Sequence, residues 1–168
     1  MLAIYAPYVE RTAISFEEEV PTISAFAERV AGIQKVYPWL VAWDGAVIGY
    51  AYASQHRARA SYRWCVDVAV YVDGRAHRRG AGRALYSDLL DRLRASNYVN
   101  AYAGITLPND ASVRLHESFG FTRIGVYSRT GFKMGRWHDV GWWQLRLRED
   151  DQPAEPLTSR ASSSAGTR

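Results

Sequence analysis

The stretch VAVYVDGRAHRRGAGRALY, residues 68–86, decides the fold of this chain. Its first five residues are apolar and rich in valine, which is typical of a buried central strand. From Gly80 onward the apolar residues return at helical spacing, so a helix follows the strand after a short loop. Because the first N–H groups of a helix lack partners within it, such a loop can hold an anion.

The loop itself supports two interpretations. It carries Arg78 and Arg79, followed by Gly80 and Gly82, and glycine lets a phosphate approach the backbone without a side chain in between. The alternative is a helix start whose arginines are only solvated, and the loop alone favours neither. The spacing matches neither G-x-G-x-x-G nor G-x-x-x-x-G-K-[ST], which argues against a dinucleotide or nucleoside-triphosphate site.

The segments on either side indicate an α/β chain with a mixed sheet. We predict helices over 22–35, 80–94 and 111–119, the last one capped by Asn109, and strands over 39–43, 47–53, 64–72, 101–106, 121–127 and 140–148. The segment SQHRARASY, residues 54–62, has no period and reads as a loop. The strand over 64–72 is nearly continuously apolar, which indicates burial on both faces.

The composition is that of one globular domain with a basic body. The chain has 168 residues, 48% hydrophobic and 23% charged, which is enough for one core and too few for two. The last 20 residues are rich in Ser, Pro, Ala and charge, so we expect a folded domain over 1–148 and a disordered tail over 149–168. That tail holds four acidic and two basic residues, which leaves the body a net charge of +6 against +4 for the whole chain. Such a field suits an anionic ligand.

The sequence argues against several other classes of protein. A single cysteine, Cys65, excludes an internal disulfide, and neither a secretion leader nor an apolar run of membrane-spanning length is visible. The histidines, at positions 56, 77, 116 and 138, show no metal-ligand spacing. The basic residues lack an interleaved aromatic platform for nucleic acid. We therefore expect a soluble cytoplasmic protein that binds no metal, nucleic acid or membrane.

Several segments together resemble one family. The opening stretch is similar to the acetyl-coenzyme-A signature of the Gcn5-related N-acetyltransferases (GNAT), in which [Q/R]-x-x-G-x-[G/A] follows the central strand. Within that superfamily the chain resembles the phosphinothricin (amino acid) N-acetyltransferases over residues 5–147. The segments that carry this resemblance are YVERTAISFE, YPWLVA, YAYAS, SYRWCVD, LPNDASVRLHESFGF and GFKMGRWHDVGWWQL. It implies the GNAT fold, a mixed and mostly antiparallel sheet flanked by helices, and a homodimer.

The resemblance also implies where acetyl-coenzyme A (acetyl-CoA) is bound. The residues that it assigns to this co-substrate are Val70, Tyr71, Val72, His77, Arg78, Arg79, Gly80, Ala81, Gly82, Arg83, Asn109 and Ser112. His77 departs from the family's Gln or Arg, and it is fully charged only near or below its pKa of about 6.5, so Arg78 or Arg79 would compensate. The chain also opens close to the family's first helix. Either the reading frame begins upstream, or the sheet lacks its usual first strand and has an open edge.

Two side chains are candidates for catalysis. Asp67 stands in an otherwise apolar strand, where a carboxylate costs free energy unless it is paired or protonated. The resemblance implies a general base here, usually a glutamate, and the shorter aspartate suggests action through a water. The alternative is a structural carboxylate bonded to an Arg or Tyr. His116 follows Asn109 by two helical turns, with Ser112 between them. The resemblance implies that His116 protonates the leaving thiolate. The alternative is that His116 has only a structural role.

The loop HRARASY, residues 56–62, carries the candidates for binding the substrate's acidic group. The resemblance places Arg57, Arg59 and Tyr62 there, and planar guanidinium groups suit bidentate binding of a carboxylate or phosphinate. A solvated basic loop is the alternative. Phe16 resembles an aromatic wall of the same pocket, and core packing explains it equally well.

Other conspicuous residues are interpreted as structural. Trp137, Trp142 and Trp143 suit the core or a subunit interface. The adjacent His138 and Asp139 do not form a catalytic pair, because neighbours in a strand face opposite ways. Buried packing likewise explains Cys65.

The sequence thus predicts an N-acetyltransferase. It would move an acetyl group from acetyl-CoA directly to the free α-amino group of a small amino acid or analogue, of the phosphinothricin or methionine sulfone and sulfoximine type. One alternative is the same chemistry on another amine, such as a polyamine or aminoglycoside, although the arginines of residues 57–59 disfavour a cationic substrate. The other alternative is a non-catalytic acyl-CoA-binding module. Two departures from the family pattern make it more credible: His77 in place of Gln or Arg, and the missing segment before the family's first helix.

Overall fold

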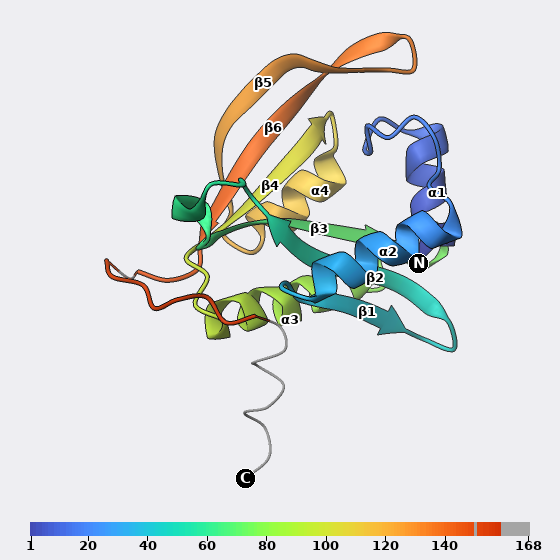
Figure 1. Ribbon diagram of the computed structural model, residues 1–168. Coiled ribbons are helices and arrows are strands. Elements are labelled where there is room, and N and C mark those ends of the chain that lie inside the picture. The colour runs from blue at the N-terminus through green and yellow to red at the C-terminus, as the bar shows by residue number, and fades with distance from the viewer. Residues whose placement is uncertain (150, 159–168) are drawn as a thin grey trace.

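The computed structural model describes residues 1–149 and 151–158 (Figure 1). In chain order the elements are α1 (Leu2–Arg11), α2 (Ile23–Gln34), β1 (Trp39–Trp43), β2 (Val47–Gln55), β3 (Cys65–Val72), α3 (Ala81–Ala95), β4 (Asn100–Leu107), α4 (Asp110–Glu117), β5 (Thr122–Lys133) and β6 (Arg136–Arg146). Two short 3-10 turns, Ala60–Tyr62 and Gly74–Ala76, flank β3. No helix within the described residues is long and apolar enough to cross a membrane.

The six strands form one mixed sheet in the order β1-β2-β3-β4-β6-β5. Neighbouring strands are antiparallel except β3 and β4, which run parallel. These two pair at only three positions, from Cys65 opposite Asn100 to Asp67 opposite Tyr102, although both strands continue beyond them. The sheet therefore divides beyond Asp67, and the two strands diverge (Figure 1). The prediction of a mixed, mostly antiparallel sheet flanked by helices is confirmed.

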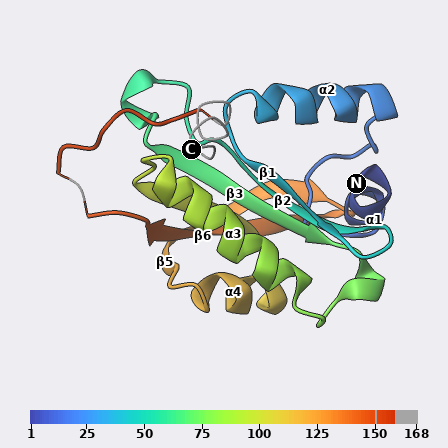
Figure 2. The same ribbon diagram turned by 90° about the horizontal axis from the view of Figure 1, so that it is seen from below.

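Helices cover both faces of the sheet. Figure 2 shows α2 on one side and α3 and α4 on the other. Under α3, the alternate residues Val66 and Val68 of β3 are buried against the leucines of that helix. On the opposite face, α1 and α2 pack on the aromatic residues of β1 and β2. The prediction that β3 is buried on both faces holds only in part, because the Asp67 side chain remains 31% exposed.

Local sequence explains where the helices begin. The Thr22 hydroxyl accepts the N–H of Ala25 at 3.1 Å and caps α2, and the Asn109 side chain accepts the N–H of Ser112 at 3.2 Å and caps α4. Helix α3 begins after Gly80, whose φ of +83° lies in the left-handed region that glycine adopts without strain. The predicted helices are therefore confirmed to within a few residues.

The last two strands are longer than the sequence predicts. Together β5 and β6 form one hairpin that extends beyond the rest of the sheet (Figure 1). Its turn is Met134-Gly135, and both residues have positive φ, as a two-residue hairpin turn requires. Nearly every residue of β5 is exposed, so neither face of the strand has to be apolar. Its sequence therefore lacks the alternation of apolar and polar residues from which the full length of a strand could be predicted.

Neither end of the described chain adds a strand to the sheet. The N-terminal residues form α1, and β1 is an edge strand. At the other end, Leu157 donates its N–H to the Ser96 carbonyl at 3.0 Å, and Ala154 accepts a hydrogen bond from the Trp64 indole. Residues 154–157 of the predicted tail are mostly exposed, and they also form hydrogen bonds with Ser96 just after α3 and with Trp64 just before β3. Residues 150 and 159–168 of the predicted tail lie outside the described residues.

Candidate active site

Asp67 lies where β3 and β4 separate, and it is paired with His56. The Asp67 carboxylate is 2.7 Å from Nδ1 of His56, and the two side chains are 31% and 11% exposed. Ser54 of β2 stands opposite Asp67 in the antiparallel register, which brings the residue just past the end of β2 to the carboxylate. His56 is a site residue that sequence reasoning missed.

The environment of Asp67 favours a proton-accepting role. Burial raises the pKa of its carboxyl above the usual value, and the His56 hydrogen bond with the nearby His56 and Arg57 charges offsets part of that rise. A carboxylate accepts protons more effectively near neutral pH when its pKa is raised. The structural partner is a histidine rather than the Arg or Tyr considered from the sequence.

Aromatic rings surround the hydrogen-bonded pair of His56 and Asp67. The His56 ring stacks on Tyr102 with centroids 4.3 Å apart, and it meets Trp142 and Tyr62 edge-on at 6.3 and 6.1 Å. The Arg57 guanidinium lies 5.9 Å from the Trp142 ring. The fold thus brings Arg57 and Tyr62, both predicted as substrate residues, into the neighbourhood of His56 and Asp67. It adds Tyr102, which sequence reasoning missed, and Trp142, which it treated as structural. We call this group the Asp67 cluster: His56, Arg57, Tyr62, Asp67, Tyr102 and Trp142.

Two predicted substrate residues, Arg59 and Phe16, do not belong to the Asp67 cluster. Arg59 is exposed, and its guanidinium forms no ion pair or hydrogen bond with the part of the chain that the structure describes, although its carbonyl accepts the N–H of Tyr62 at 2.9 Å. Phe16 packs on the hairpin, where a Cβ added to Gly131 of β5 would overlap its ring, and its centroid is 6.3 Å from that of His138. Ile14, two residues earlier, reaches the cavity described next.

A cavity opens where the two halves of the sheet separate. Its lining residues are Ile14, Val68, Ala69, Val70, Tyr71, Tyr86, Ala103, Gly104, Ile105, Thr106, Asn109, Ser112 and His116. Five residues predicted as co-substrate or catalytic residues therefore meet here, from β3 and from both ends of α4. Among the described residues, β3 pairs with no strand on the β4 side beyond Asp67, so its backbone there is available to a ligand, apart from the Val72 carbonyl, which accepts from Tyr8.

His116 is buried and held at both ring nitrogens. Nε2 lies 2.7 Å from the Tyr86 hydroxyl, and Nδ1 lies 2.7 Å from the Ser112 carbonyl oxygen. Because a carbonyl only accepts, Nδ1 carries the proton and Nε2 accepts the hydrogen bond from Tyr86. Burial lowers the pKa of His116, and the bond to Ser112 offsets this only in part, so the ring is neutral near pH 7.

The loop before α3 has the features of a phosphate site. The N–H groups in the first turn of α3 have no partner within the helix. A Cβ added to Gly82 would make only ordinary contacts with Val72 and Leu115, at 3.5 and 3.8 Å, so packing within the chain does not require glycine there. Arg78 and Arg79 are exposed and pair with no carboxylate among residues 1–149 and 151–158. These features fit a diphosphate.

Two of the predicted phosphate-binding side chains are engaged within the chain. His77 Nε2 lies 3.1 Å from the Val72 carbonyl oxygen, to which Tyr8 also donates its hydroxyl hydrogen at 2.7 Å. Arg83 donates to the Ser118 hydroxyl at 3.2 Å and lies over the Phe119 ring. Arg78 and Arg79 are therefore the guanidinium groups of this loop that remain available to a ligand.

The remaining residues interpreted as structural make packing contacts. Trp143 is buried and donates to Glu117 at 3.2 Å. His138 Nε2 lies 3.1 Å from the Lys133 carbonyl oxygen, whereas Asp139 accepts the N–H of Arg129 at 2.8 Å. In the described part of the chain, no three His, Cys, Asp or Glu side chains gather closely enough to hold a metal ion.

The divided sheet, the cavity and the phosphate loop define the class of protein. Residues 1–142 match the acetyltransferase (GNAT) domain, and the chain belongs to this family. It is an N-acetyltransferase that uses acetyl-CoA as its co-substrate. The family and the enzyme class predicted from the sequence are thereby confirmed.

Individual relatives narrow the comparison. The chain is 43% identical over 154 residues to a phosphinothricin N-acetyltransferase of Streptomyces viridochromogenes, covering 90% of this chain and 84% of the relative. It is 40% identical over 118 residues to an L-methionine sulfoximine/L-methionine sulfone acetyltransferase of Salmonella typhimurium, covering 70% and 69%. A phosphinothricin acetyltransferase from Sinorhizobium meliloti, solved with acetyl-CoA, superposes with a TM-score of 0.87 at 37% identity, covering 93% and 85%.

Proposed function

We propose that this enzyme acetylates the free α-amino group of a small amino acid or analogue, of the phosphinothricin or methionine sulfone and sulfoximine type. The observation that carries this proposal is the Asp67 cluster, where a carboxylate of raised pKa lies beside Arg57 at the point where the sheet divides. Relatives named for these substrates support it. An amino acid offers both groups that such a site can bind, an ammonium to deprotonate and an acidic group.

The proposed acceptor site uses the loop over residues 56–62. Arg57 and Arg59 would bind the carboxylate or phosphinate, and Tyr62 would close the site beside His56. Phe16 is proposed as a wall of the site, supported only by its partial exposure. A polyamine would meet two guanidinium groups here, which is why we favour an anionic acceptor over a cationic one.

The proposed site for acetyl-CoA uses the loop and the cavity together. The diphosphate would lie on Arg78, Arg79, Gly80, Ala81 and Gly82, while Val70, Tyr71, Val72, Asn109 and Ser112 would contact the arm that carries the acetyl group. When bound, acetyl-CoA supplies a thioester whose carbonyl carbon accepts the amine. Free N–H groups on the β4 side of β3 would stabilise the oxyanion that this attack creates. His77 and Arg83 would contribute through the positions of the strand end and the helix rather than by direct contact.

The proposed chemistry assigns one role to each catalytic candidate. Asp67 would take the ammonium proton through a water, and His56 would hold the carboxylate in place. The neutral His116 ring would relay a proton to the leaving thiolate: the nitrogen of the tetrahedral intermediate gives up its second proton to Nε2, by way of the Tyr86 hydroxyl at the cavity wall, and the thiolate takes that proton as it leaves. Direct transfer requires no covalent enzyme intermediate.

A matched pair of amines tests the substrate class. We expect acetyl-CoA-dependent thiol release with methionine sulfone, methionine sulfoximine or phosphinothricin. The decarboxylated analogue of methionine sulfone should lose about a hundredfold in kcat/KM, because arginines desolvated for an acid are left unpaired. Spermidine and an aminoglycoside serve as cationic competitors. Equal turnover of the decarboxylated analogue, or preference for spermidine, would overturn the proposal.

We also propose a homodimer. The observation that supports it is strand β5, which is exposed on both faces and carries Ile124, Val126 and Tyr127 at 52%, 37% and 51% exposure. An edge strand of this length that exposes several apolar side chains is a typical site for association with a second copy.

A further inference from the structure

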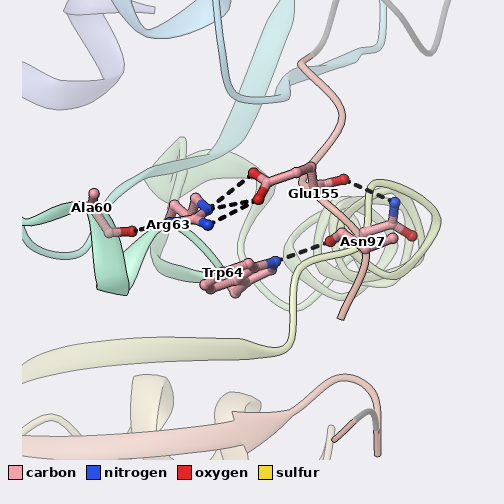
Figure 3. A network of polar contacts seen from close by, with 6 residues as sticks. Ala60, Arg63, Trp64, Asn97 and Glu155 are labelled. Carbon is pink, nitrogen blue, oxygen red and sulfur yellow. Dashed lines mark hydrogen bonds and ion pairs between the residues drawn. The ribbon is translucent and has the colours of Figure 1, made fainter. Parts of the chain in front are cut away.

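The segment over residues 151–158 bridges two parts of the molecule that are distant in sequence. The Glu155 carboxylate accepts hydrogen bonds from two nitrogens of Arg63: Nη2 donates to Oε1 at 2.9 Å, and Nε donates to Oε2 at 2.9 Å and to Oε1 at 3.1 Å (Figure 3). The Glu155 carbonyl accepts from the Asn97 amide at 3.1 Å, and the neighbouring Ala154 carbonyl accepts from the Trp64 indole at 2.9 Å. One segment is thus fixed both to the start of β3 and to the end of α3.

Arg63 transmits this attachment to the turn before β3. Its Nη1 donates to the Ala60 carbonyl at 3.1 Å, so the same guanidinium holds the turn Ala60–Tyr62 and Glu155 (Figure 3). The guanidinium also lies 3.9 Å from the centre of the Trp64 ring. A bidentate pair with an aromatic face beneath it has one preferred geometry, unlike a simple contact between two flexible ions.

The turn belongs to the loop that carries the proposed acceptor residues. Every residue from 57 to 63 is exposed, so the core does not fix this part of the chain. Tyr62 lies within the turn, and its ring meets that of His56, which is bonded to Asp67. The position of the turn therefore affects the geometry of the Asp67 cluster.

We propose that residues 154–157 position the 57–63 loop for binding the amino acid, with Glu155 acting through Arg63 as a positioning residue. This inference rests on the proposed function, because it concerns the same acceptor site. Two possible effects of Glu155 have opposite signs. If its negative charge merely lowered the positive potential around Arg57 and Arg59, removing the charge would improve binding of an anionic substrate. If Glu155 holds the loop, removing the charge weakens that binding.

Steady-state kinetics of the full chain test the proposal. For Glu155→Gln we expect the amino-acid KM to rise about threefold to tenfold, or about 0.7 to 1.4 kcal/mol, with kcat and the acetyl-CoA KM unchanged. Arg63→Lys should reproduce the effect, because lysine cannot bind the carboxylate bidentately. The charge-exchanged pair Arg63→Glu with Glu155→Arg should recover much of the loss. Glu149→Gln is the matched control, since this carboxylate pairs with Arg146 away from the loop.

A second measurement separates this proposal from the proposed function. Amide hydrogen exchange over residues 57–63 should accelerate in Glu155→Gln and not in Glu149→Gln, whatever the substrate. If the unmodified chain acetylates no amino acid, the proposed function fails, and exchange alone decides whether the segment holds the loop. An unchanged or lower amino-acid KM in Glu155→Gln, or unchanged exchange of the loop, overturns the positioning role.

Discussion

Asp67 is the residue on which the proposed chemistry depends most directly. We expect Asp67→Asn to lose about a hundredfold or more of kcat near pH 7, because an amide cannot take the ammonium proton. The asparagine carbonyl can still accept a hydrogen bond from His56, so the fold and the affinity for acetyl-CoA should be retained. Turnover assays and calorimetric titration with acetyl-CoA measure the two effects. Unchanged turnover would exclude Asp67 as the base.

His56 sets the pH range in which Asp67 can act. Burial raises the pKa of the Asp67 carboxyl and His56 partly offsets the rise, so removing His56 should raise this pKa further. Because the base must be ionised, activity is lost as pH falls through that pKa. We therefore expect His56→Phe, which keeps a ring on Tyr102, to move the acidic limb of kcat/KM to higher pH.

The control for this experiment is Tyr62→Phe, which leaves the pairing of His56 with Asp67 intact. Its acidic limb should coincide with that of the unmodified enzyme. A limb that stays in place in His56→Phe, or moves to lower pH, would mean that another group controls the ionisation of the site.

The two partners differ in how far the sequence reveals them. Asp67 is conspicuous because a carboxylate in an apolar strand asks for a partner. His56 sits in a segment without period, and its proximity to Asp67 comes from the register of β2 against β3. Nothing near His56 in the sequence encodes that register, so its role could be found only in three dimensions.

At the scale of elements, the start of α3 carries the clearest test of the phosphate site. A Cβ at position 82 makes only ordinary contacts within the chain, and we expect the branched side chain of a valine to occupy the space above the helix start. We expect Gly82→Val to raise the Kd for acetyl-CoA about tenfold or more. Its effect on the melting temperature should be a few degrees at most.

Gly32→Val is the matched control for this substitution. Gly32 lies in α2, and a Cβ there meets no atom within 4 Å. Both variants add a β-branched residue to a helix, so their melting temperatures should change comparably, whereas only Gly82→Val should weaken binding of acetyl-CoA. If the two variants bound acetyl-CoA with equal affinity, the diphosphate would not bind at this loop.

A helix or strand could be predicted from the sequence where it has a buried face or a capping residue. Helices α2 and α4 are marked by Thr22 and Asn109 and by an apolar period, so both could be identified from the sequence. The length of β5 could not, because its residues are exposed and show no alternation. The cavity could not be predicted either. The sequence indicates only that β3 and β4 are apolar strands, whereas the space between them exists because they diverge after Asp67.

At the scale of the whole molecule, the divided sheet brings the two reactants' proposed sites together. His56 and Asp67 come from the half formed by β1 to β3, whereas Tyr102 and Trp142 come from the half formed by β4 to β6. The Asp67 cluster therefore spans the junction, next to the cavity that opens beyond it. A change that alters the angle between the halves would act on both sites at once.

The outer edge of the second half supplies the last prediction, which concerns association. If β5 pairs with a second copy, charged residues on it should separate the subunits, because burying an unpaired ammonium group costs several kcal/mol. We expect light scattering to give twice the mass of one chain for the unmodified protein and the mass of one chain for the double variant Ile124→Lys and Val126→Lys. Val41→Lys adds a charge to β1, at the opposite edge of the sheet, where Val41 is 44% exposed, and it should remain a dimer. Dissociation of Val41→Lys together with persistence of the β5 variant would place the interface on β1, and a monomeric unmodified protein would exclude the dimer altogether.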